Sequence, residues 1–173
     1  GITYWIMTQL CNSIRLRGVV MEDFINYRLP SMFLISSFCD WKCCHDGGFS
    51  EKICQNNNII SVPIKEFSYS SLLNAYVKNK ISKAIVVGGL EPFKQFDEIY
   101  GLINYFRQND VLDTFVIYTG YDKQEICQQI DNMMNFKNII IKFGRYVPNQ
   151  REHYDEILGI NLASNNQYAE VIC

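Results

Sequence analysis

The chain has 173 residues, enough for one domain with a sizeable hydrophobic core. Hydrophobic residues make up 48% of it and charged residues 20%, the formal net charge is −2, and no block of basic residues suggests a nucleic-acid partner. No apolar run approaches the roughly 20 residues that span a bilayer, and the N-terminus shows no signal-peptide pattern. We therefore expect a globular domain with neither a nucleic-acid nor a membrane partner.

Seven cysteines are many for a domain of this size. Their number is odd and two of them, Cys43 and Cys44, are neighbours, whereas a secreted disulfide framework calls for an even set of spaced thiols. We therefore expect a reducing compartment, the cytoplasm, with some of the thiols binding metal. Cys127 falls in a helical pattern and is expected to be a small buried apolar residue.

In chain order, residues 1–17 fit no clear element, and we treat them as an N-terminal extension to a domain that spans residues 18–173. Residues 18–27 are expected to form a leading strand or an extended arm. The short apolar run 32–36 is the first candidate for a core strand. A polar loop, 39–58, follows this run and carries the cysteine cluster.

Beyond the loop, helix-like and strand-like patterns alternate. Apolar residues recur at helical spacing over three segments: 69–77, 93–106 and 126–133. Asp122 and Glu125 have the spacing of a capping box that opens the last of these helices, with Asp in place of Ser or Thr. Three continuous apolar runs between the helices are expected to be buried strands: 84–87, 115–118 and 139–141.

This alternation predicts an α/β fold with a parallel sheet and helical crossovers, a partial (βα) half-barrel. In such folds the chemistry gathers at the carboxyl ends of the strands. The cysteine loop, the pair Gly88-Gly89 and the pair Thr119-Gly120 each follow a strand, so we expect all three at one edge of the sheet. Lys142 interrupts the last apolar strand and is expected to point to that edge or to solvent.

The cysteine loop offers thiolates at metal-ligand spacing. Cys39 and Cys43 form a C-x3-C pair, and Cys54 follows in the same loop. Thiolates suit iron–sulfur clusters and zinc, and three of them would leave one iron of a 4Fe–4S cluster open for a substrate. Zinc usually takes four ligands, often in C-x2-C pairs; Cys44 and His45 supply further donors, but no such pair exists here. The cysteines alone leave iron–sulfur, zinc and unliganded thiols open.

A second motif stands after the second core strand. Glycines at Gly88 and Gly89 let a ligand approach the backbone closely, and Glu91 offers an acceptor for an ammonium or hydroxyl group. Pro92 is suited to the first turn of the helix that follows. A tight strand-to-helix turn without a ligand explains the same residues equally well.

Together these two motifs resemble the radical S-adenosylmethionine (AdoMet) family, which has C-x3-C-x2-C in the loop after the first strand and G-G-E-P after the second. Cys39 and Cys43 keep the family spacing, and the stretch 88–92, Gly-Gly-Leu-Glu-Pro, is the second motif with one residue inserted. The resemblance runs from about Val19 to the C-terminus.

More narrowly, the chain resembles the activating enzymes of anaerobic (class III) ribonucleotide reductases. Their third cysteine is followed by an aromatic residue and Asn, and here Cys54 is followed by Gln and Asn. Their Y-T-G after the third strand is matched at 118–120, and their Ser-Ser-Asn-Gln stretch is echoed at 163–167. A glycine-aromatic turn after the fourth strand is echoed at 144–146.

The chain departs from the family in the cysteine loop. Ten residues, 44–53, separate Cys43 from Cys54, where the family has two, and Asp46 stands where the family's third cysteine would fall. Either the loop is extended and Cys54 is the third ligand, or Cys44 takes that place. We favour Cys54, because the Gln and Asn that the subfamily pattern calls for follow it.

The resemblance implies a 4Fe–4S cluster on Cys39, Cys43 and Cys54, with AdoMet bound beside it. Reductive cleavage of AdoMet would install a glycyl radical on a partner, the anaerobic ribonucleotide reductase, with electrons from a reductant such as flavodoxin. The resemblance assigns contacts with AdoMet to these residues: Ile53 (against adenine), Gln55, Gly88, Gly89, Glu91, Tyr118 and Thr119. Two alternatives remain: a zinc-stabilised or cluster-bearing binding module without this activity, and an activator of a different partner protein.

Overall fold

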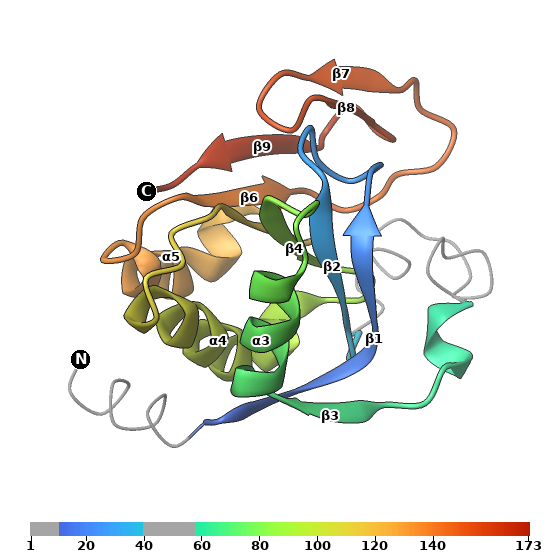
Figure 1. Cartoon of the computed structure of the whole chain (residues 1–173). Helices are drawn as coiled ribbons and strands as arrows, with labels where there is room; N and C mark the ends of the chain where they lie inside the picture. The colour runs from blue at the N-terminus through green and yellow to red at the C-terminus, as the bar shows by residue number, and fades with distance from the viewer. Residues whose placement is uncertain (1–10, 40–57) are drawn as a thin grey trace.

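The computed structural model describes residues 11–39 and 58–173. Their centre is a seven-stranded sheet in the order β3-β1-β2-β4-β5-β6-β9, beside a separate hairpin of β7 and β8 (Figure 1). The strands of the sheet are β1 (Ser13–Asp23), β2 (Ser31–Ser36), β3 (Lys65–Ser68), β4 (Ala84–Gly88), β5 (Phe115–Tyr118), β6 (Ile139–Phe143) and β9 (Tyr168–Val171). The hairpin consists of β7 (His153–Asp155) and β8 (Ile160–Leu162).

The four central strands, β2, β4, β5 and β6, are parallel, and the flanking β1, β3 and β9 pair antiparallel to their neighbours. The crossovers contain α3 (Tyr69–Lys78), α4 (Phe96–Gln108) and α5 (Cys127–Met133), with 3-10 turns η2 (Ile59–Ser61), η3 (Pro92–Gln95) and η4 (Lys123–Ile126). The α/β class and the parallel core of the sheet are thereby confirmed. The sheet of the described residues is open, with β3 and β9 at its edges, and the half-barrel shape stays a prediction.

Local sequence explains where the helices begin. The Ser68 hydroxyl accepts a hydrogen bond from the backbone N–H of Ser71 at 3.1 Å and caps α3. The expected capping box is present: the backbone N–H of Asp122 donates to the Glu125 carboxylate at 3.0 Å. Both caps satisfy donors that the first turn of a helix leaves without intrahelical partners.

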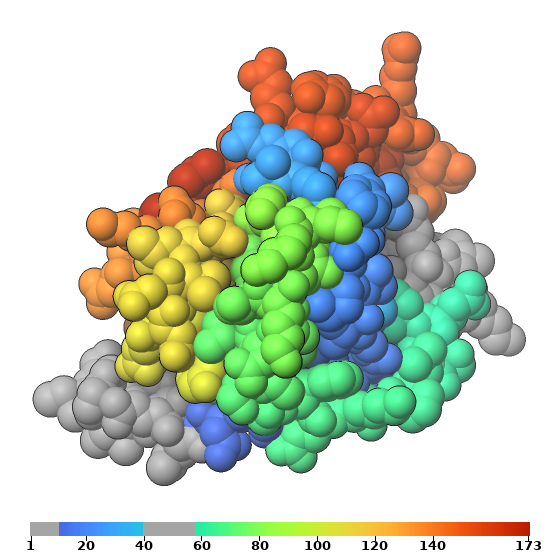
Figure 2. Space-filling model, in the orientation of Figure 1, coloured from blue at the N-terminus to red at the C-terminus, as the bar shows by residue number. Residues whose placement is uncertain are grey.

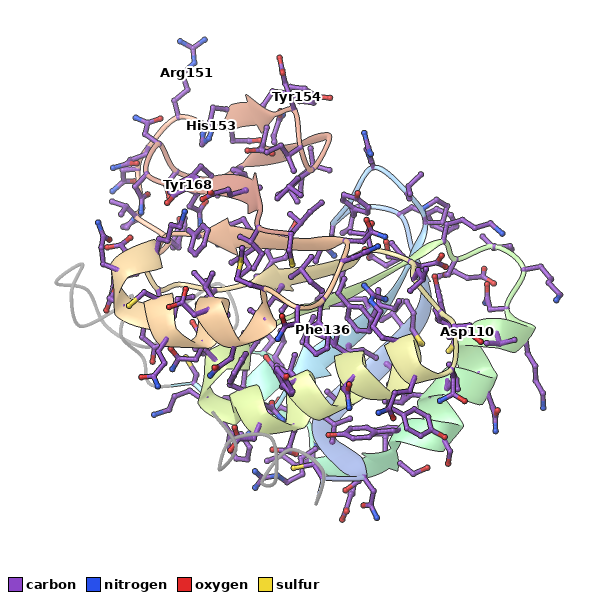
Figure 3. All side chains as sticks on the ribbon, turned by 90° about the vertical axis from the view of Figure 1, so that its left-hand side faces the viewer. Asp110, Phe136, Arg151, His153, Tyr154 and Tyr168 are labelled. Carbon is purple, nitrogen blue, oxygen red and sulfur yellow. The ribbon has the colours of Figure 1, made fainter. Side chains whose placement is uncertain are left out.

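The sheet has a different covering on each face. The three helices pack on one face, where alternate strand residues such as Leu34, Val87 and Ile117 join the main core. The other face carries a smaller core, in which Val86 and Val116 pack against Leu158 of the C-terminal segment. Figure 3 shows the hairpin on the side of the sheet away from the helices, with Arg151 and the 64% exposed Tyr154 on its outer side.

The turn between β1 and β2 packs on this second face as well. Tyr27 is buried among Leu158 and Leu162, and Gly159 lies so close to Arg28 that an added Cβ would stand 2.7 Å from the Arg28 Cβ. Figure 2 shows the same contact as blue atoms of the turn lying against the orange C-terminal segment. The β1–β2 turn and the C-terminal segment therefore meet over one face of the parallel core.

Three expectations need correction. β1 begins at Ser13 and ends at Asp23, so it includes residues of the segment 1–17 to which we assigned no element. Cys127 is exposed at the start of α5 and is not the buried apolar residue expected. Four strands, β3, β7, β8 and β9, were not expected at all; they have three or four residues each and carry mixed polar and apolar side chains.

Candidate functional site

A cleft of about 470 Å³ lies at the carboxyl ends of the parallel strands, where such folds place their ligands. Its walls come from the ends of β2, β4, β5 and β6, from the β1–β2 turn and from the C-terminal segment. The residues that line the cleft include Cys39, Ile59, Gly89, Glu91, Tyr118, Thr119, Lys142 and Gly144. The volume lies within the range of about 300–1,000 Å³ typical of small-molecule sites.

Glu91 joins two of the turns that form the cleft. Its side chain is only 6% exposed, and its carboxylate accepts hydrogen bonds from the Thr119 hydroxyl at 2.9 Å and the Gly120 N–H at 2.8 Å. It also caps η3 by accepting from the Phe93 N–H at 3.0 Å. Because the three donors come from the turns after β4 and β5, this carboxylate fixes the spacing of those turns.

Gly89 lines the cleft beside Glu91, and Gly88 adjoins it. Gly89 has φ of +89°, and a Cβ there would stand 2.8 Å from the Ile35 Cγ2 atom, so both backbone conformation and space require glycine. A Cβ on Gly88 would meet the Phe33 ring at 3.2 Å and the Tyr118 Cβ at 3.3 Å. The glycines therefore serve the close packing of the turn against β2 and Tyr118.

Tyr118 and Lys142 are cross-strand neighbours on the face away from the helices. The Tyr118 hydroxyl donates to the Asn26 carbonyl, and burial raises the pKa of this phenol, so Tyr118 stays neutral. Lys142 is 7% exposed, donates to the Gly144 carbonyl at 3.2 Å and lies 5.5 Å from the centre of the Tyr118 ring. The lysine thus reaches the expected edge but lies in the cleft wall and not in solvent.

Cys39 stands three residues beyond the end of β2 and is fixed by the chain before it. The Ser36 hydroxyl donates to the Gly88 carbonyl at 2.7 Å, and the Ser37 N–H donates to the buried Gln95 side chain at 2.8 Å. The Phe38 carbonyl accepts from the Glu91 N–H at 2.7 Å. The first predicted ligand is therefore held against the same turns that form the cleft.

The structure brings five of the predicted site residues to one place: Cys39, Gly89, Glu91, Tyr118 and Thr119 line the cleft, and Gly88 adjoins it. The others, Cys43, Ile53, Cys54 and Gln55, lie outside the described residues. Within the described part of the chain no three His, Cys, Asp or Glu side chains gather at metal-binding distance, which accords with two of the three predicted ligands lying outside it.

The described residues fit a cysteine-ligated cluster with a small molecule beside it. A thiol, the ligand type of iron–sulfur clusters, opens on a cleft of small-molecule size. Gly89 also lines this cleft, at the turn that Ile35 packs against. Cys43 and Cys54 would complete the ligand set from the loop that Cys39 begins.

Two residues at the site were not assigned to it from sequence. Gln95 is 4% exposed and bridges the Ser37 N–H and the Arg15 carbonyl, the latter at 2.8 Å. Nothing in the sequence marks it, since a glutamine within a helical pattern is ordinarily exposed. Lys142 could have been recognised from sequence, because a lysine within an apolar strand is rarely buried without a specific role.

A family model described as a 4Fe-4S single cluster domain matches residues 31–168, most of the chain. The matched region begins at β2 and ends at β9, so it contains the cysteine loop and all the strand ends that form the cleft. Searches of curated proteins and of solved structures found no significant match. Throughout residues 11–39 and 58–173, each helix is too short or too polar to traverse a bilayer.

Proposed function

The chain belongs to the family of 4Fe-4S single-cluster domains, and from this premise we propose that it cleaves AdoMet reductively and activates a glycyl-radical enzyme. The single observation that carries the proposal is the shared cleft: Cys39 opens on the same space as Gly89 and Thr119. The proposed cluster ligand and the proposed AdoMet site would thereby be neighbours. That adjacency is what a cluster with one open iron requires of its surroundings.

Cys39, Cys43 and Cys54 would hold the cluster. When bound, the reduced cluster supplies one electron that splits the sulfonium C–S bond, leaving methionine and a 5′-deoxyadenosyl radical. The protein's contribution is to position AdoMet and to exclude water. Buried walls on both sides of the cleft, at Glu91 and Lys142, serve the second task.

The roles of individual residues follow from their places. The backbone at Gly89, with Gly88 behind it, would meet the methionine part of AdoMet, and Thr119 lines the same cleft. Glu91 orders the two turns, and its proposed contact with the amino group would add to that role. Tyr118, held by Asn26, forms the facing wall.

Ile53 and Gln55 flank Cys54 in the sequence, and we propose that they contact the adenosine part of AdoMet. The radical would take a hydrogen atom from a glycine of the partner, giving 5′-deoxyadenosine and a glycyl radical. We propose the anaerobic ribonucleotide reductase as that partner, with flavodoxin as the class of electron donor. The resemblance of the motifs at 54–56 and 118–121 supports this choice over other glycyl-radical enzymes.

Anaerobic reconstitution with iron and sulfide tests the proposal. The protein should bind about four irons, turn brown, and release methionine and 5′-deoxyadenosine from AdoMet when a reductant is added. Cys39→Ala should lose both the colour and the products. Cys127→Ala is the matched control, because that thiol is exposed on α5 and does not line the cleft, and it should behave as the wild type.

Three results would contradict the proposal at different levels. Reconstituted protein without iron, or aerobically purified protein with one stoichiometric zinc, would favour the zinc-stabilised module. A full cluster that leaves AdoMet intact would favour a cluster-bearing module without this activity. AdoMet cleavage without a glycyl radical on the anaerobic reductase would leave the chemistry standing and point to a different partner protein.

A further inference from the structure

We propose that Arg17 is a positioning residue for the cysteine loop, in that its guanidinium joins the backbone that enters the loop to the backbone that leaves it. This inference rests on the proposed cluster at Cys39 and names a residue on which retention of that cluster depends. Arg17 lies on β1, before the region that the family model matches.

The contacts of Arg17 reach both ends of the loop. Its Nε donates to the carbonyl of Ser37 at 2.9 Å, two residues before Cys39. Its Nη1 donates to the carbonyls of Ile60 at 2.7 Å and Val62 at 2.6 Å, just after the loop. One half-buried side chain therefore closes the base of the segment that contains all three proposed ligands.

A distortion of β1 places the guanidinium there. Leu16 pairs with Ser36 and Gly18 pairs with Ile35, so Arg17 is an extra residue in β1, with the register shift expected of a β-bulge. Bulges turn a side chain away from its regular direction and are common beside active sites. The planar fork of Arg suits a site where several carbonyl oxygens must be bound at once.

The two ends of the loop are held differently. The entrance has other anchors as well, from Ser36, Gln95 and Glu91, as described for Cys39. The exit turn η2 contains no buried residue, and Arg17 binds the carbonyl of Ile60 within it and that of Val62 directly after it. Loss of Arg17 would therefore release the exit while leaving the entrance in place.

That release would change the spacing between the ligands at the two ends of the loop. Cys39 is next to the entrance contacts, whereas Cys54 lies five positions before η2 in the sequence, so we expect its spacing from Cys39 to depend on the exit. Groups that orient metal ligands from outside the ligand set typically change metal retention roughly 10–100-fold when they are removed. We expect an effect of that size on the rate of cluster loss.

The test compares Arg17→Gln with Arg107→Gln in the full chain after anaerobic reconstitution. Arg107 is a matched control, because its guanidinium also binds three backbone carbonyls, those of Val111 at 2.8 Å, Asp113 at 3.0 Å and Lys137 at 2.6 Å. These carbonyls precede β5 and β6, at the opposite ends of the strands from the cleft. Iron and sulfide content, the rate of bleaching by EDTA, and the urea midpoint are measured for each protein.

We expect Arg17→Gln to lose its cluster to EDTA at least tenfold faster than wild type. The bleaching rate of Arg107→Gln should stay close to that of wild type, even if its urea midpoint falls as far as that of Arg17→Gln. Arg17→Lys keeps the charge but not the planar guanidinium, so its bleaching rate should lie between those of wild type and Arg17→Gln. It is the variant to use if Arg17→Gln does not fold. Equal bleaching rates for Arg17→Gln and wild type, or equal acceleration in both Gln variants, would overturn the role of Arg17. Wild-type protein that takes up no iron would overturn the proposed cluster itself, a separate result.

Discussion

Replacement of Glu91 by Gln should destabilise the protein by roughly 2–3 kcal/mol, a size that follows from its hydrogen bonds. One carboxylate oxygen accepts from the Gly120 N–H at 2.8 Å and the other from the Phe93 N–H at 3.0 Å. Whichever oxygen becomes NH₂ in the variant, it faces a backbone N–H donor. One charge-assisted bond is lost and its buried donor is left without an acceptor; this single defect costs about 1–3 kcal/mol, and the charge on the carboxylate places it in the upper part of that range.

Urea unfolding at neutral pH measures this loss directly. Glu152→Gln is the control, because Glu152 is exposed, and its free energy of unfolding should stay within about 0.5 kcal/mol of wild type. If Glu91→Gln unfolds within the same margin as the control, the carboxylate does not hold the two turns together. If it keeps its stability but loses affinity for AdoMet, Glu91 serves the ligand and not the fold.

Two further predictions concern the floor of the cleft and the main core. Gly89→Ala should lower the free energy of unfolding by about 1–3 kcal/mol, because φ is +89° and the added Cβ would meet Ile35. The control Gly120→Ala, whose Cβ would stand 3.6 Å from Glu91, should be near neutral. Equal urea midpoints for the two variants would contradict this prediction. The pKa of Tyr76 is raised, mainly by burial and then by its hydrogen bond to Asp113. The stability that this hydroxyl contributes is therefore complete below the pKa of an unfolded tyrosine, about 10, and is lost as pH rises above that value. Tyr76→Phe should therefore be about 1 kcal/mol less stable at pH 8 yet lose less stability than wild type between pH 9 and 11, and parallel urea-midpoint curves would refute this.

The parallel core was predictable because its strands are buried on both faces. Ala84–Gly88 and Ile139–Phe143 are continuously buried, and such strands show up in a sequence as apolar segments, unbroken in the first case and interrupted only by Lys142 in the second. The helices between them show the 3.6-residue period, since each buries one stripe on the sheet. The capping box at Asp122 and Glu125 is a local pattern and was recognised from spacing alone.

The edge strands escaped prediction for the opposite reason. β3 and β9 are four residues long and only partly buried, so their apolar pattern is short and weak. β1 did carry a signal, because Ile14 and Leu16 are buried and alternate with Arg15 and Arg17, the period of a half-buried strand. We overlooked that alternation and so left Arg17 outside the domain.

The site was predictable to the extent that it depends on strand ends. Cys39, Gly89 and Thr119 each follow a parallel strand, and the topology alone brings such positions to one edge. The contacts that fix them are long-range. Arg17 reaches Ile60 across 43 positions of the sequence, and Gln95 reaches Arg15 across 80, and no local pattern encodes such pairs.

The extended spacing between Cys43 and Cys54 is compatible with a cluster on energetic grounds. Lengthening a segment from two residues to ten raises the entropic cost of closing it by about 1.4 kcal/mol, because that cost grows only with the logarithm of length. A hydrogen bond from a charged donor contributes about 1.5–3 kcal/mol, and Arg17 makes three of them across the base of this loop. One such bond is enough to offset the added closure cost. The short ligand spacing of the radical AdoMet family that the motifs resemble can therefore be exchanged for a longer loop, provided that the loop is closed at its base, which is where β1 places Arg17.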